Sequence, residues 1–287
     1  MNLDTQRAKA EAFRAMHDRS KILVLPNAWD PMSARVIEEA GARAIATTSA
    51  GVAFSVGYPD GEAMPRDEMI AAIARIARVV TVPVSADIES GFAHDAREVA
   101  ETVRRVIEAG AVGINLEDAI HGGPPALYDL ETAVDRVRAA REAANSAGVP
   151  IVINARTDVY LLSIGEPDAR FDHAVRRANA YRKAGADCLF VPRIGRPADI
   201  ERIVGALEGP LNLLAFPGIP TVTELERLGV ARLSVGTWPT LAAMSTARKI
   251  AAELLGTGTY ESMFDGTGIS YPEANRLMAG PNTQSKK

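Results

Sequence analysis

The chain has 287 residues, of which 47% are hydrophobic and 24% charged, and its formal net charge at pH 7 is -4. This composition is that of an ordinary globular protein with enough chain for a large buried core. The net negative charge and the lack of a Lys/Arg cluster argue against nucleic-acid binding. No apolar run approaches the roughly 18 residues that cross a membrane, so no membrane partner is expected.

The N-terminus and the cysteine content concern the cellular setting. The first residues, MNLDTQRAKAEAF, are charged and lack the apolar stretch of a signal peptide. The single cysteine, Cys188, is followed by three apolar residues, which favours a small core side chain over a nucleophile. One cysteine cannot form an internal disulfide, so a reduced, cytoplasmic protein is expected.

In chain order, the first predicted element is an extra helix at 4–17, a candidate barrel lid. A recurring phrase then organises the sequence: an amphipathic run, a turn with Gly, and a short apolar strand. In each copy the Gly falls just past the last periodic residue, where a left-handed helix C-cap is expected. The strands lack alternation, as in strands buried on both faces. We predict strands at 22–28, 44–50, 82–88, 112–118, 151–157, 188–194, 211–217 and 232–238.

The predicted helices lie at about 30–40, 66–79, 95–109, 129–147, 170–184, 197–207, 221–228 and 239–256. Four prolines stand at or just before helix starts, where a missing N–H costs nothing: Pro31, Pro65, Pro197 and Pro239.

Eight alternations of strand and helix imply parallel pairing with right-handed crossovers, and eight such units close naturally into a (β/α)8 TIM-type barrel. An open doubly wound sheet is the alternative, but the sequence LPNAWDP offers no Gly-rich phosphate loop after the first strand. Residues 1–287 are therefore predicted to form a single barrel domain, with its core at about 20–256. The tail at 257–287 contains one helical patch, YPEANRLMA, before a frayed polar end.

Polar residues collect at the predicted C-terminal strand ends, where the chemistry of such barrels occurs. They are Asp60 after the second strand, Asp87 and Glu89 on the third, Glu117 and Asp118 on the fourth, Asn154, Arg156 and Asp158 on the fifth, and Arg193 on the sixth.

Several carboxylates at one rim repel each other unless a hard cation neutralises them. Mg²⁺ is the expected metal, with Mn²⁺ as the alternative, because the candidate ligands are oxygens and no Cys or His pair has zinc spacing. Asp87 and Glu117 are the favoured functional carboxylates. For Asp118 and Asp158, a structural role as a helix cap or an ion-pair partner is as strongly indicated as a role in the site.

Arg156 is suited to bidentate capture of a substrate carboxylate or phosphonate. An ion pair with Asp87 or Glu117 is the alternative, and the two roles can coexist. The small-residue turn formed by Ser49, Ala50 and Gly51 offers backbone N–H groups to a further anionic oxygen.

These segments resemble the isocitrate lyase/phosphoenolpyruvate mutase superfamily over roughly residues 20–240. The resemblance rests on PNAWDPMSARVIEEAG, TTSAG followed by PDG, VPVSADIESGF, AGAVGINLED, INARTD and the AGAD turn. It implies a barrel that binds Mg²⁺ and a 2-oxo acid and that makes or breaks a C–C or P–C bond next to an enolate. It also implies a homodimer or homotetramer in which the eighth helix is swapped.

The resemblance assigns roles to individual residues. Asp87 would bind the metal directly and Glu117 would hold metal-bound water. Arg156 would grip the substrate carboxylate, and Asp60 would face the reacting bond. The substrate-binding set is completed by Ser49, Ala50, Gly51 and Asn154.

Three departures limit the resemblance. The K-K-C-G-H loop of the lyases is replaced at 119–128 by AIHGGPPALY, a candidate lid, which argues against a true isocitrate or methylisocitrate lyase. The Lys and Asn that P–C bond enzymes carry in this loop are missing, as is their His, at Pro192. Ser85 replaces the first Asp of the family's D-A-D motif, and Glu89 is proposed to restore that charge as a third metal ligand.

The sequence therefore predicts a Mg²⁺-dependent lyase that cleaves or decarboxylates a small 2-oxo or 2-hydroxy acid through an enolate. His121, in the candidate lid, is the proposed proton donor, with a plain surface histidine as the alternative. A P–C bond enzyme and a non-catalytic 2-oxo acid binder are the other two interpretations.

Overall fold

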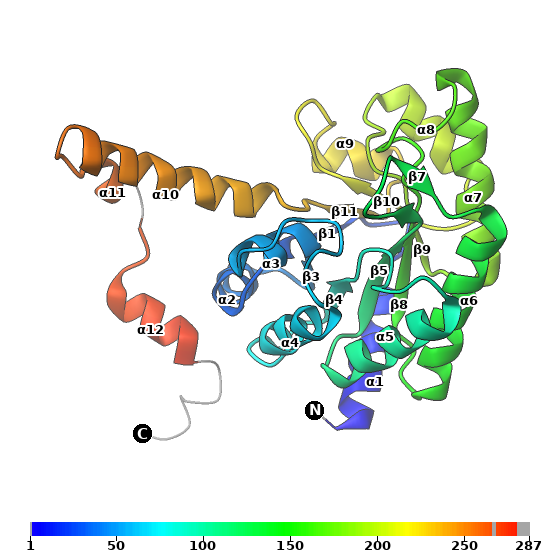
Figure 1. The fold of residues 1–287 in the computed structure, drawn as a ribbon, viewed down its shortest axis with the longest axis horizontal. Coiled ribbons are helices and arrows are strands. Elements are labelled where there is room, and N and C mark those ends of the chain that lie inside the picture. The colour runs from blue at the N-terminus through cyan, green and yellow to red at the C-terminus, as the bar shows by residue number, and fades with distance from the viewer. Residues whose placement is uncertain (1, 266–267, 280–287) are drawn as a thin grey trace.

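The computed structural model describes residues 2–265 and 268–279. Its parallel strands wind into a barrel surrounded by helices (Figure 1). Within the described residues, nine segments follow in the order β1-β11-β10-β9-β8-β5-β4-β3-β2. Segments β1 (Leu23–Leu25) and β2 (Asn27–Ala28) are two halves of one strand on either side of Pro26, and they pair with β11 and β3 respectively. The ring therefore has eight strands, and the predicted (β/α)8 barrel is confirmed.

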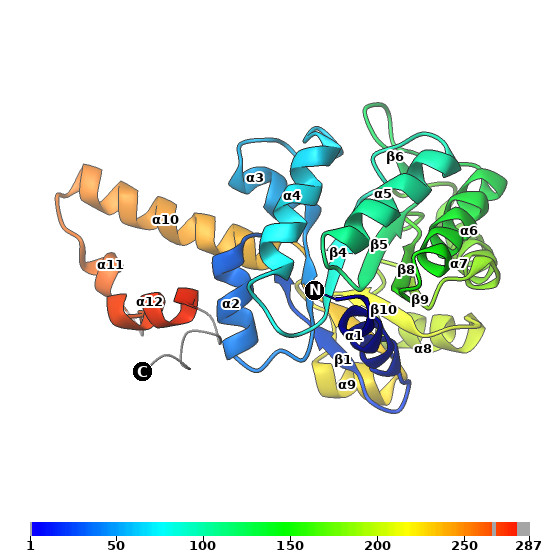
Figure 2. The same cartoon turned by 90° about the horizontal axis from the view of Figure 1, so that it is seen from below.

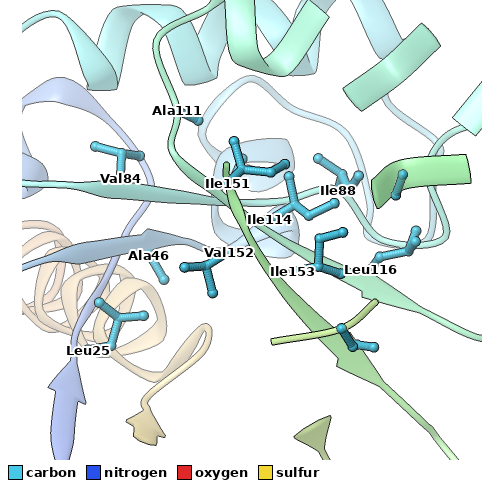
Figure 3. Packing of buried hydrophobic residues seen from close by; sticks show 14 of the residues in the cluster. Leu25, Ala46, Val84, Ile88, Ala111, Ile114, Leu116, Ile151, Val152 and Ile153 are labelled. Carbon is cyan, nitrogen blue, oxygen red and sulfur yellow. The ribbon is translucent and has the colours of Figure 1, made fainter. Parts of the chain in front are cut away.

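Every predicted strand coincides with an observed one. The other barrel strands are β3 (Ile45–Thr47), β4 (Val84–Asp87), β5 (Gly113–Glu117), β8 (Val152–Arg156), β9 (Cys188–Phe190), β10 (Leu211–Leu214) and β11 (Arg232–Ser234). Their outward side chains form the main core with the surrounding helices, and Figure 3 shows this packing around Ile114, Ile151 and Ile153.

The helices agree with the periodicity of the sequence. They are α2 (Pro31–Glu39), α4 (Arg66–Ala77), α5 (Ala96–Glu108), α6 (Leu130–Ser146), α7 (Arg170–Ala184), α8 (Pro197–Ala206), α9 (Val222–Arg227) and α10 (Trp238–Gly256). Helix α7 ends as predicted at Gly185, whose φ of 114° only glycine adopts without strain. The short elements that were not predicted include two at the strand ends: helix α3 (Ser49–Ser55), and a hairpin of β6 (Ala119–Ile120) with β7 (Ala126–Leu127) inside the candidate lid.

Helix α1 (Leu3–Ala15) closes the N-terminal end of the barrel, opposite the strand ends that carry the predicted site. Gln6 Nε2 donates to the carbonyls of Ile107 and Ala111 at 2.7 and 3.1 Å. The Phe13 ring occupies the space that a Cβ on Gly113 would need, with a separation of 2.6 Å. The extra helix is thus a plug at the far end and not a lid over the site.

Helix α10 does not pack around its own barrel but extends away from it (Figures 1 and 2). The chain then returns through α11 (Glu261–Phe264) to α12 (Tyr271–Ala279), the predicted helical patch of the tail. Helix α12 lies against α2, where Arg35 Nε donates to the Leu277 carbonyl at 2.9 Å. The predicted frayed end at 280–287 lies outside the described residues. None of the helices in the described part of the chain is both long and apolar enough to cross a membrane.

Candidate active site

The C-terminal strand ends open into two adjoining cavities that share Ser49, Asp60 and Arg156. The inner cavity reaches into the barrel and also contains Ala50, Asp87 and Asn154. The outer cavity lies under the β6–β7 hairpin and adds the predicted residues Glu89, Glu117 and His121. Among the residues predicted to act in catalysis or to bind substrate or metal, only Gly51 lines neither cavity, and its N–H points to Thr48 Oγ1 at 3.4 Å.

Asp87 is fixed from three sides at the end of β4. Its Oδ2 accepts from the Ser49 N–H at 3.0 Å and its Oδ1 accepts from Asn115 Nδ2 at 2.9 Å, while its own N–H donates to Thr47 Oγ1 at 2.8 Å. Asn115 is held in turn by Asn154 Nδ2, which donates to its Oδ1 at 3.0 Å. The carboxylate therefore faces the inner cavity in a single orientation.

Arg156 projects from the end of β8 between two carboxylates. It makes a bidentate pair with Asp158, at 2.5 Å from Nε to Oδ1 and 3.0 Å from Nη2 to Oδ2, and its Nη1 lies 2.9 Å from Glu117 Oε2. Burial alone would lower the pKa of Arg156, but the charges of Asp158 and Glu117 outweigh it and raise that pKa. A permanently charged guanidinium thus lines both cavities, and the ion-pair and substrate-binding roles remain compatible.

Glu89 lies beyond Asp87 in a left-handed backbone conformation with φ of 50°. Such strain is typical of functional sites. Its Oε2 accepts from the Glu62 N–H at 2.7 Å. Burial, followed by the charges of Asp87 and Asp60, raises the pKa of Glu89 to about 8. Burial and the charge of Asp87 also raise the pKa of Asp60. These carboxyl groups repel one another, so the site would gain from a cation.

His121, on the hairpin, lies against two of these carboxylates. Its Nε2 is 3.1 Å from Glu117 Oε1 and 3.8 Å from Glu89 Oε2. Burial lowers its pKa, but the adjacent Glu117 carboxylate outweighs this effect and raises the pKa to about 9. The imidazole is therefore protonated at neutral pH and can donate a proton at the mouth of the site.

Two predicted polar positions lie outside the cavities. Asp118 is buried behind the site, where its Oδ2 accepts from Arg177 Nε at 2.7 Å and Tyr181 Oη at 2.6 Å. Arg193 is exposed, with its guanidinium 5.8 Å from the centre of the Phe216 ring. Asp118 therefore has the structural role that was left open for it.

Apart from Asn154, the prediction missed the polar residues within the strands that line the inner cavity. They include Asn27, Thr47, Asn115, Asn212, Arg232 and Ser234. The signal was a period of two: Asn115 precedes Glu117 by two positions, as Asn154 precedes Arg156, so these side chains share a face of the sheet.

Among the side chains of residues 2–265 and 268–279, no three His, Cys, Asp or Glu residues are grouped closely enough to hold a metal by themselves. Asp87 lines the inner cavity, whereas Glu89 and Glu117 line the outer one. This donor set fits Mg²⁺, which in proteins commonly takes one or two carboxylates together with water and substrate oxygens.

A closed (β/α)8 barrel with acidic groups and an arginine at its C-terminal strand ends belongs to the class of barrel enzymes. The family model for phosphoenolpyruvate phosphomutase matches residues 13–255. The chain belongs to this family, within the phosphoenolpyruvate mutase/isocitrate lyase superfamily.

Among curated relatives, an uncharacterised protein of Mycobacterium tuberculosis is 35% identical over 84% of this chain and 87% of its own length. The 2-methylisocitrate lyase of Escherichia coli is 32% identical over 89% of this chain and 87% of its own length.

Two solved structures extend the comparison. A putative lyase/mutase from Burkholderia cenocepacia has a TM-score of 0.89 at 38% identity, over 96% of this chain and 98% of that one. A phosphonopyruvate hydrolase in complex with oxalate and Mg²⁺ has a TM-score of 0.83 at 26% identity, over 96% of this chain and 97% of that one.

Proposed function

We propose that the protein is a Mg²⁺-dependent carbon–carbon lyase acting on a small 2-oxo or 2-hydroxy carboxylic acid by C–C cleavage or decarboxylation. The single observation that carries this proposal is that Asp87 and Arg156, each fixed by its neighbours, line one cavity at the strand ends. The E. coli relative, named as a 2-methylisocitrate lyase, supports the reaction class. The complex of phosphonopyruvate hydrolase supports the metal.

In this reaction the carboxylates would bind the metal and Arg156 would bind the substrate. Asp87 would hold Mg²⁺, with Glu89 and Glu117 completing its surroundings from the outer cavity. The metal would act as a Lewis acid that polarises the 2-oxygen of the substrate. Arg156 binds the substrate carboxylate and stabilises the negative charge that develops beside it.

In this proposal, proton transfer takes place in the outer cavity. His121 donates its proton to the carbanion carbon of the enolate, and Glu117, at 3.1 Å, keeps the imidazole charged until then. The hairpin that carries His121 covers this cavity, which helps to keep water from the enolate. Asp60 lines both cavities and would face the reacting bond.

One screen separates the three interpretations of the site. The wild-type protein is incubated with and without Mg²⁺, or with Mn²⁺, on oxaloacetate, alkylmalates, methylisocitrate and phosphonopyruvate, and pyruvate and phosphate are followed. An Asp87→Asn variant controls for decarboxylation by free metal. Asp87-dependent pyruvate without phosphate supports the lyase. Phosphate release indicates a P–C bond enzyme, and oxo-acid binding without turnover indicates a binding protein; either result overturns the proposal.

The same family assignment leads us to propose a homodimer or homotetramer in which α10 is exchanged. Of the described α10 residues only Thr240 is buried, and Leu241, Met244 and Leu255 are exposed. In a (β/α)8 barrel the helix after the last strand covers the outside of the first. Here that surface is open: an apolar groove lies over β1, and its lining includes Val24, whose side chain is 39% exposed. We expect α10 of a second copy to fill that groove. A cytoplasmic location agrees with the buried thiol of Cys188.

A further inference from the structure

The inner cavity continues below Asp87 to a polar floor, which we define as Ser85, Asn154, Asn212, Arg232 and Ser234. Barrel interiors of this type are normally filled by branched apolar side chains. Here the floor contains a guanidinium, because Arg232 on β11 points inward with only 2% of its surface exposed. No step of the proposed reaction uses this group.

The charge of Arg232 is not neutralised by its immediate neighbours. Its Nη1 lies 3.5 Å from His17 Nε2, and its buried Nε has no hydrogen-bond partner among residues 2–265 and 268–279. His17 Nδ1 lies 2.9 Å from the Phe13 carbonyl, which can only accept, so Nδ1 carries the proton and Nε2 is a neutral acceptor. Burial raises the pKa of Cys188, the other neighbour, to about 12, which leaves its thiol neutral.

Arg232 remains a cation at neutral pH, although burial lowers its pKa to about 10. The carboxylate that acts on it through space is Asp87, whose two oxygens already accept from Ser49 and Asn115. Two further polar atoms around the floor, Ser85 Oγ and Asn154 Oδ1, are buried and have no hydrogen-bond partner within the described part of the chain. Unpartnered buried charges and polar groups are costly, so a ligand that satisfied them would bind favourably.

We propose that the floor is a second anion-binding subsite, in which Arg232 receives a carboxylate of a small organic acid. The inference rests on the proposed function. With Arg156 at the mouth and Arg232 at the floor, one cavity holds two guanidinium groups, and a short dicarboxylic acid would bind in preference to a monocarboxylic one. The carboxylate belongs either to the substrate itself or to a separate small acid. Arg232 is then a determinant of specificity rather than a catalytic residue.

Calorimetry with Mg²⁺ and two matched ligands tests whether the carboxylate that Arg232 receives belongs to the substrate. Malate and 2-hydroxybutyrate share a four-carbon backbone and differ in a terminal carboxylate or methyl group. We expect the wild type to bind malate at least about tenfold more tightly, and Arg232→Gln to lose that preference while oxalate affinity changes less than about threefold. The exposed Arg193→Gln should retain the preference. Equal binding by the wild type, or a preference retained in Arg232→Gln, contradicts the substrate source.

A crystal of the wild type soaked in bromide tests the subsite without any variant. An anomalous peak within hydrogen-bonding distance of Arg232 Nε supports an anion site, and in the absence of a malate preference it assigns a separate small anion. No peak together with no malate preference overturns the inference. If Arg232→Gln fails to fold, Arg232→Lys retains the charge and should retain part of the preference. If the wild type did not bind oxalate, the proposed function would be contradicted. The bromide result would still show whether the floor binds an anion.

Discussion

Arg156 has two tasks, since the same guanidinium neutralises Asp158 and Glu117 and faces the substrate. Lysine would retain the charge but not the planar fork. We expect Arg156→Lys to weaken Mg²⁺-dependent oxalate binding by about 1.5–3 kcal/mol, the range for a hydrogen bond to a charged group. Calorimetry measures the change, and Arg193→Lys, at an exposed arginine outside both cavities, is the matched control. An unchanged affinity would contradict bidentate binding of the ligand by the Arg156 guanidinium.

At the scale of residues, the sequence predicted the charged groups at strand ends and missed most of the polar groups within strands. Asp87 and Arg156 were identifiable because each ends an apolar run, where a packed core has no need of a charge. Arg232 and Asn115 sit inside such runs, and only the pleat decides that they face inward. Gly51 is the opposite case, a residue that was predicted to line the site but only lies beside it. Its N–H faces Thr48 Oγ1 and not the cavity.

Helix α3 places Ser49 and Ala50 at the cavity, and its position depends on Gly51. A Cβ there would lie 2.6 Å from both Thr240 Oγ1 and Thr48 Cγ2. We expect Gly51→Ala to lower the free energy of unfolding by about 1–3 kcal/mol through overpacking and to weaken oxalate binding as Ser49 shifts.

The matched control is Gly205→Ala in α8, where a Cβ meets nothing within 4 Å. That change should stabilise the protein by up to about 1 kcal/mol, since alanine favours the helix. Urea unfolding measures both variants. If Gly51→Ala proved as stable as Gly205→Ala, the close packing of α3 against α10 would not be real.

The elements themselves followed from periodicity and from Gly at helix ends, which are local properties of the chain. The seven-residue helix α3 was not predicted because it is too short to show a periodic pattern. The direction of α10 could not be predicted either, since an amphipathic helix does not specify whether its partner surface lies on its own barrel or on another.

At the scale of the whole molecule, the exposed face of α10 predicts the oligomeric state. Leu241→Glu would place a charge in the apolar groove of the second copy, where burial of an unpaired charge is costly. We expect this variant to be monomeric by light scattering at concentrations where the wild type is dimeric or tetrameric. Val56→Glu, at a residue 47% exposed outside α10, should leave the mass unchanged. An oligomeric Leu241→Glu protein would place the interface elsewhere.

The plug formed by α1 predicts how the fold responds to acid. Burial lowers the pKa of His17 in the folded chain from 6.5 to about 3. Between these values the unfolded chain binds one proton more, so His17 reduces stability as the pH falls below about 6.5, by up to about 1.4 kcal/mol per pH unit. Urea unfolding at pH 7.5 and 5.5 should therefore show a smaller loss in His17→Gln than in the wild type. An equal loss would mean that His17 is protonated in the folded protein.

The most direct test of the central claim, that Asp87 and Arg156 jointly hold Mg²⁺ and a 2-oxo acid, is oxalate binding to Asp87→Asn. This change keeps the size of the side chain and removes its charge. Calorimetry should show that Mg²⁺ strengthens oxalate binding to the wild type and has no effect on the variant. Mg²⁺-dependent oxalate binding of undiminished affinity in Asp87→Asn would contradict the claim.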